Sequence, residues 1–160
     1  GFVLLQMMIN GVASLDMITE EGPTSVKEAR NHVYIFSNAP TDWIDNERAH
    51  FPEVFELLRG CHIMTSGQAG ALKPSEEAYS YIFEQHGITA EDILLIDDTE
   101  ANVIGAREIG MEAVHFDYKN IEITLQELVD NEALTEHARD LIMDAIKDHR
   151  TPFDIEKTLF

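Results

Sequence analysis

Short apolar runs alternate with segments of helical periodicity along most of this chain. Strands are predicted at four such runs, over residues 33–36, 62–64, 93–96 and 113–116. Helices are predicted before and between them, over residues 25–31, 42–50, 53–58, 75–85 and 101–109. The run at 93–96 is apolar throughout, which is typical of a strand buried on both faces under helices. The alternation therefore predicts an α/β fold with a parallel sheet flanked by helices.

The pattern changes after residue 116. A short helix is predicted over residues 124–130, and a longer helix over residues 133–149. The longer helix has an apolar stripe at helical spacing, so we expect it to pack on the sheet of its own chain rather than to form a partner surface. We expect three segments: an N-terminal segment at residues 1–24, the α/β core at residues 25–131 and a C-terminal helical extension at residues 132–160.

Two adjacent acids follow the strand at 93–96 directly. Asp97 and Asp98 should lie just outside the carboxyl end of this strand, where ligands bind to open α/β sheets. Two neighbouring carboxylates repel each other and are costly to desolvate unless a cation or hydrogen-bond donors compensate. Hard oxygen ligands of this kind suit Mg²⁺. The pair indicates a magnesium site, and the alternative is a solvated strand end where Asp98 or Thr99 caps the next helix.

Polar residues also follow the strand at 33–36, and a lone lysine precedes a predicted helix. Ser37 and Asn38 come directly after that strand, where a hydroxyl and free backbone N–H groups can hold an anionic oxygen. Lys73 precedes Pro74, so its backbone should be extended, and Pro74 can open the helix that follows. The alternatives are an ordinary turn for Ser37 and Asn38 and a solvated surface position for Lys73.

These segments, in this order, resemble the haloacid dehalogenase superfamily. The resemblance is closest to its subfamily IA-like branch, which includes sugar-phosphate phosphatases and the phosphatase-like domain of epoxide hydrolases. Residues 35–38 are similar to the second family motif, residues 65–79 to the third and residues 95–110 to the fourth. The resemblance implies a Rossmann-like parallel sheet and Mg²⁺-dependent hydrolysis of a phosphate monoester, with a small phosphorylated metabolite as substrate. The cap domain, which normally selects that substrate, is absent or incomplete.

The resemblance also implies a role for each site residue. Ser37 would hydrogen-bond the transferred phosphoryl group, and Asn38 would belong to the same phosphate site. Lys73 would balance the negative charge on the phosphate and on the nucleophile. Asp97 and Asp98 would hold Mg²⁺.

The first family motif, an aspartate nucleophile at the end of the central strand, is not recognisable. The first 36 residues contain no Asp-x-Asp, and their only aspartate is Asp16. In one interpretation, residues 2–9 form the first strand with Met8 at the place of the nucleophile, where a thioether cannot form the covalent intermediate. In the other, residues 2–18 are the last helix of a cap domain, and the chain lacks its real first strand.

The apolar stripe and the Met and Gln content of residues 2–18 favour the cap helix. Without a central strand, the sheet would have two unpaired edges, so we expect a homo-oligomer. Two functions remain open at this point. One is a phosphatase that is impaired in this chain, and the other is a catalytically inactive domain that binds a phosphorylated ligand or a protein partner.

Composition and net charge limit the classes of partner and the cellular compartment that we expect. The net charge is −19, with 30 acidic residues against 11 lysines and arginines, which argues against nucleic acid binding. The single Cys61 excludes an intramolecular disulfide, so nothing requires an oxidising compartment. No apolar run approaches the length of a membrane span, and the N-terminal stretch lacks the basic leader of a signal peptide. We therefore expect an acidic cytoplasmic protein that binds neither nucleic acid nor membrane.

Overall fold

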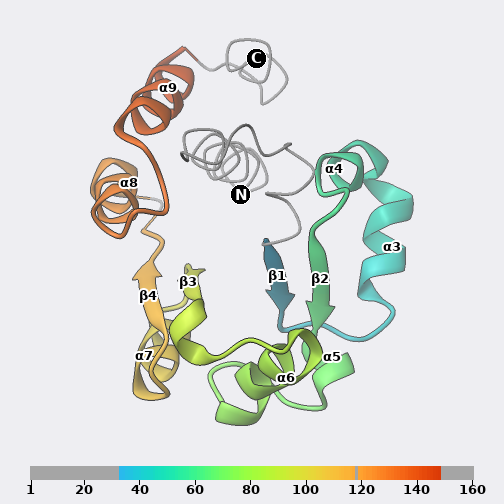
Figure 1. Ribbon diagram of the computed structural model, residues 1–160. Coiled ribbons are helices and arrows are strands. Elements are labelled where there is room, and N and C mark those ends of the chain that lie inside the picture. The colour runs from blue at the N-terminus through green and yellow to red at the C-terminus, as the bar shows by residue number, and fades with distance from the viewer. Residues whose placement is uncertain (1–32, 118, 149–160) are drawn as a thin grey trace. The chain divides into compact units, whose positions relative to one another are not determined.

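A computed structural model describes residues 33–117 and 119–148 of the chain (Figure 1). Several predictions lie outside these residues: the helix at 25–31, the choice between strand and cap helix for residues 2–18, and any role of Asp16. The end of the C-terminal extension, residues 149–160, lies outside them as well.

Strands and helices alternate through the first part of the described chain. The elements are, in order, β1 (Tyr34–Ser37), α3 (Trp43–His50), α4 (Pro52–Leu57), β2 (His62–Thr65), α5 (Ser66–Ala69), α6 (Glu76–His86), the 3-10 turn η1 (Ala90–Asp92), β3 (Leu94–Asp97), α7 (Glu100–Glu108), β4 (Glu112–His115), α8 (Ile121–Asp130) and α9 (Glu136–Lys147). The four predicted strands are all present, within one or two residues of their expected ends. The fold is α/β, as the alternation predicts.

The described strands form two small sheets, β1–β2 and β3–β4, rather than one. Strands β3 and β4 are parallel and in register from Leu94 opposite Glu112 to Asp97 opposite His115. The arrows of β1 and β2 also point the same way (Figure 1). The first strand that the sequence offers, at residues 2–9, is outside the described range, so the single continuous sheet stays a prediction.

One apolar cluster packs against β3 and β4. Its buried members come from α6, α7, β4 and the turn before β4, and they are Tyr79, Val103, Ala106, Met111 and Ala113. Ile93 and Leu95 pack on this cluster from the β3 segment. Leu94, Leu95 and Ile96 are each partly buried, so burial of this strand on both faces stays a prediction. Alternate side chains of a strand point to opposite faces, and this cluster covers one of them.

Two compact units divide the chain. One unit comprises residues 35–47 and 63–124, and it contains the apolar cluster and all of the predicted site residues. The described part of the other unit includes residues 48–62 and 125–148. There the predicted apolar stripe is buried: Leu134, Ala138 and Ile142 of the α9 region are each 2% exposed. Among the described residues, no helix is long and apolar enough to cross a membrane.

Candidate functional site

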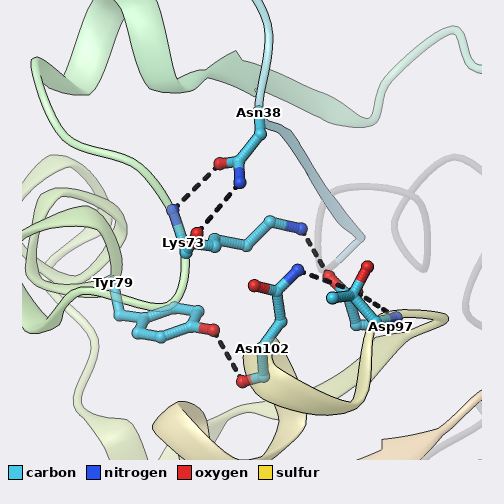
Figure 2. A network of polar contacts seen from close by, with 6 residues as sticks. Asn38, Lys73, Tyr79, Asp97 and Asn102 are labelled. Atoms are coloured by element: carbon cyan, nitrogen blue, oxygen red, sulfur yellow. Dashed lines mark hydrogen bonds and ion pairs between the residues drawn. The ribbon is translucent and has the colours of Figure 1, made fainter.

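The loop after β1 is fastened to the backbone of Lys73 by one side chain. Asn38 Nδ2 donates to the carbonyl oxygen of Lys73 at 3.0 Å, and the Lys73 N–H donates to Asn38 Oδ1 at 2.9 Å (Figure 2). We call this pair of hydrogen bonds the Asn38–Lys73 clamp. The two residues are 35 positions apart in sequence. The clamp therefore joins the end of β1 to the segment that precedes α6.

The same loop is also tied to the start of α5. The Ala39 carbonyl oxygen accepts from the Gly67 N–H at 3.0 Å and from Ser66 Oγ at 3.1 Å. A Cβ atom on Gly67 would lie 2.5 Å from the backbone nitrogen of Thr41, so a side chain at this position would collide with the loop. Glycine is thus required here for the close approach of two backbones.

Helix α5 itself is a difference from the sequence prediction, which left residues 65–72 without regular structure. Thr65 and Gln68 form a reciprocal cap: the Thr65 N–H donates to Gln68 Oε1 at 2.9 Å, and the Gln68 N–H donates to Thr65 Oγ1 at 3.3 Å. Gly70 closes the turn in the left-handed conformation, with φ of 70°. This compact turn sets the path of the chain from β2 towards Lys73.

A buried ion pair lies at the centre of the site. Lys73 Nζ is 2.5 Å from Asp97 Oδ2, and the two side chains are only 9% and 7% exposed. The Lys73 ammonium also lies 5.7 Å from the centroid of the Phe36 ring, within range of a cation–π contact. The alternative of Lys73 as a solvated surface lysine is therefore wrong.

The second oxygen of Asp97 is held by α7. Asp97 Oδ1 accepts from the backbone N–H of Thr99 at 2.8 Å and from Asn102 Nδ2 at 2.9 Å. The carbonyl oxygen of Asn102 in turn accepts from the hydroxyl of Tyr79 at 2.7 Å (Figure 2). Each oxygen of the Asp97 carboxylate thus has at least one donor, as a buried charge requires.

This environment shifts two pKa values in opposite directions. Burial alone would raise the pKa of Asp97, but the hydrogen bonds from Lys73, Asn102 and Thr99 and the charge of Lys73 outweigh it and lower the pKa. Burial, and then the negative charge of Asp97, raise the pKa of Tyr79 to about 12. At neutral pH, Asp97 is therefore a carboxylate and Tyr79 a neutral donor.

Lys73 is held on its other side by Pro74 and α7. The Lys73–Pro74 peptide bond is cis. Gly105 of α7 lies so near Pro74 that a Cβ atom on it would be 2.6 Å from Pro74 Cβ. Helix α7 therefore positions both partners of the ion pair, Asp97 through Asn102 and Lys73 through Pro74.

Asp98 has a different environment from its neighbour. Its side chain is exposed and makes no hydrogen bond or ion pair with the described residues, whereas Asp97 is buried. Only the backbone carbonyl oxygen of Asp98 is engaged, 3.2 Å from His115 Nε2. The Asp98 carboxylate is therefore the one available to a ligand from solvent.

The Asp97 and Asp98 carboxylates fit part of the ligand shell of an Mg²⁺ ion. Asp98 is uncommitted, and three donors occupy the Asp97 carboxylate, which leaves about one of its four acceptor positions open. Mg²⁺ usually takes one or two protein carboxylates and fills its remaining positions with water and substrate phosphate. No group of three or more His, Cys, Asp or Glu side chains that could hold a metal occurs in residues 33–117 and 119–148. These carboxylates can thus supply part of a magnesium shell, not all of it.

The structure brings most of the predicted site residues together. Asn38, Lys73 and Asp97 form one connected network, and Asp98 follows it directly in sequence. Ser37 is the last residue of β1 and is half-buried. Its hydroxyl makes no hydrogen bond within the described part of the chain.

Sequence reasoning assigned no role to Asn102 or Tyr79, which hold Asp97 in place. A signal was available for Asn102. An Asn side chain near the start of a helix readily bonds to nearby groups, and Asn102 lies in the first turn of α7, five residues after Asp97. Tyr79 gave no comparable signal, since a tyrosine on the inner face of a helix is ordinary core.

Comparison with known proteins gives one match and one negative result. No model of a known protein family matches the chain. A sesquiterpene phosphatase of Aspergillus oryzae is 31% identical to it over 84 residues, which is 52% of this chain and 41% of the phosphatase. The chain thus spans about two fifths of the length of the curated relative it matches.

Proposed function

We propose that this chain is a haloacid dehalogenase-like domain with a Rossmann-like core that binds the phosphoryl group of a phosphate monoester together with Mg²⁺. The buried Lys73–Asp97 ion pair is the observation that carries the proposal. A lysine side chain that is only 9% exposed is costly to bury, even beside the Asp97 carboxylate, and binding of an anion would explain why it is there. The similarity to a phosphatase supports phosphate as that anion.

Each residue has a part that follows from its contacts. Lys73 Nζ donates one hydrogen bond, to Asp97, and so has two further donors for phosphoryl oxygens. The hydroxyl of Ser37, which has no hydrogen-bond partner among the described residues, would be a second donor. Asp98 and the open position of Asp97 would hold Mg²⁺, which when bound neutralises phosphate charge. Asp97 holds the Lys73 ammonium in place through the ion pair.

We further propose that hydrolysis by this chain is weak. Asp97 is the carboxylate bonded to Lys73, and its oxygens already accept three hydrogen bonds, so it is a poor nucleophile. This same observation favours the second candidate function, a catalytically inactive domain that binds a phosphorylated ligand. Both candidates predict binding of phosphate, and only the first predicts turnover.

The substrate class is open to a direct test. A small phosphorylated metabolite is the general proposal, and the name of the distant relative makes an isoprenoid monophosphate a specific candidate. Turnover of p-nitrophenyl phosphate and of farnesyl monophosphate, with and without Mg²⁺, distinguishes a weak enzyme from an inactive domain. Mg²⁺-dependent turnover that is lost in Ser37→Ala supports the weak enzyme, and no turnover of either ester supports the inactive domain.

The magnesium site is tested by calorimetry on the wild type and on Asp98→Asn. Asp98 is exposed and makes no side-chain hydrogen bond, so this change should leave the fold intact. We expect weak Mg²⁺ binding by the wild type and none by Asp98→Asn. Glu91→Asn, at another exposed acid of the same unit, is the control and should bind like the wild type. Identical titrations for the wild type and Asp98→Asn would refute the site.

A further inference from the structure

We infer that Asn38 is a positioning residue for Lys73 and not a phosphate ligand. This inference rests on the proposed phosphate site and assigns a different task to one of its residues. The resemblance placed Asn38 in the phosphate site beside Ser37. In the structure, its amide is directed at the backbone of Lys73, with both the oxygen and the nitrogen in use.

The chemistry of the amide explains why asparagine suits this position. The clamp needs one donor and one acceptor in a single plane, to pair with the carbonyl and the N–H of the same residue. Two hydrogen bonds of 3.0 and 2.9 Å on one residue mimic the pairing of two peptide groups. An aspartate at residue 38 would keep the acceptor and lose the donor, and an alanine would lose both.

The consequence of the clamp falls on the Lys73 ammonium. The Lys73 backbone is fixed on one side by Asn38 and on the other by the contact between Pro74 and Gly105. With its backbone fixed, the side chain needs less ordering to reach Asp97 and an incoming anion. Asn38 therefore acts on phosphate through Lys73, although its own side chain is exposed.

A double-mutant cycle on orthophosphate binding separates the two roles. We expect Asn38→Ala to weaken binding about tenfold in the wild-type background, and by less than about twofold when Lys73 is already Gln. A direct phosphate ligand would cost the same in both backgrounds, and that result would overturn the inference. Because Asn38 is exposed, Asn38→Ala opens no buried cavity, and the variant should fold.

A second readout does not depend on phosphate. The Lys73 ammonium, paired and nearly buried, should give a slowly exchanging NMR signal that is identified by its loss in Lys73→Gln. We expect the protons of this signal to exchange with water at least about threefold faster in Asn38→Ala than in the wild type. In Asn38→Asp, the exchange rate should lie between those of the wild type and Asn38→Ala. Asn131→Ala is the matched control, since it removes an amide-to-carbonyl hydrogen bond of 2.7 Å to Glu127 in the other compact unit. It should leave the Lys73 signal unchanged.

The two readouts keep failure of the inference apart from failure of the proposed function. Wild-type protein that binds no phosphate at any Mg²⁺ concentration refutes the proposed function, and the ammonium signal then decides the clamp alone. An unchanged Lys73 signal in Asn38→Ala would overturn the clamp whatever the phosphate result.

Discussion

Two lysine–aspartate pairs in this molecule have the same chemistry and opposite settings. Lys73 and Asp97 meet at 2.5 Å with side chains 9% and 7% exposed. Lys147 and Asp144, one turn apart on α9, are 3.9 Å apart with side chains 68% and 63% exposed. In the first pair, Asp97 accepts two further hydrogen bonds, from Thr99 and Asn102. The second pair is a surface contact within one helix.

The difference shows how burial decides what an ion pair contributes. In water the attraction is screened, and holding two long side chains together costs entropy, so surface pairs contribute little. In a buried site the cost of desolvation is large, and each partner depends on the other and on its hydrogen bonds. The desolvation cost of Lys73 therefore falls at the site that we propose to bind phosphate.

The largest effect should come from breaking the buried pair. Asp97→Asn leaves the Lys73 ammonium without its counter-charge, so we expect the free energy of unfolding to fall by about 3 kcal/mol. Urea denaturation measures this change. In the Lys73→Met/Asp97→Asn double variant, the loss should be clearly smaller than the sum of the two single losses. Additive losses would contradict the coupling.

The contribution of Asp97 to the stability of the fold should decrease as the pH is lowered. The pKa of Asp97 is lowered in the folded state, so the unfolded chain takes up the proton first as the pH falls. The stabilisation is present when the pH is above the ordinary aspartate pKa of about 3.9. It is lost as the pH falls through the lower pKa that Asp97 has in the folded state.

Denaturation of the wild type and Asp97→Asn between pH 7 and pH 3 tests this dependence. The stability difference between the two proteins should be constant down to about pH 5 and shrink below about pH 4. The two proteins are compared at each pH because Asp92 and Asp117 also have lowered pKa values and add their own pH dependence to both. A difference that grows on acidification would contradict the assignment.

Tyr79→Phe should have a smaller effect. The change removes the hydroxyl that donates to the carbonyl oxygen of Asn102 and keeps the buried ring. We expect a loss of about 1 kcal/mol in the free energy of unfolding. In the wild type, the Tyr79 phenol should ionise only near pH 12, and ultraviolet titration should show this late step disappear in the variant.

The surface pair should show the smallest effect. Lys147→Ala removes an exposed contact, and we expect a change below about 0.5 kcal/mol that 0.5 M salt reduces further. A loss comparable to that of Asp97→Asn would break the comparison between the two pairs.

The sequence allows the main frame of the fold to be predicted. The apolar runs locate the four strands, and Asp97, Asp98 and Lys73 stand out because charges follow a strand or precede a helix.

The remaining contacts could not be predicted, because they depend on tertiary approach. The Asn38–Lys73 clamp joins residues 35 positions apart, and nothing near Asn38 indicates its partner. Helix α5 was missed because Gly67 within it and Gly70 directly after it suggest a loop, although Thr65 and Gln68 have the spacing of a reciprocal cap. Local sequence patterns predict helices and strands, whereas the site depends on contacts between them.

Orthophosphate binding, followed by ³¹P NMR in the presence of Mg²⁺, tests the central claim most directly. The wild type should bind phosphate, Lys73→Gln should lose about tenfold or more in affinity, and Lys147→Gln should not differ from the wild type. Ser37→Ala leaves the buried ion pair intact, and it should also bind phosphate more weakly than the wild type. Equal affinities in the wild type, Lys73→Gln and Ser37→Ala, or no binding by the wild type, would contradict a phosphate site at the Lys73–Asp97 pair.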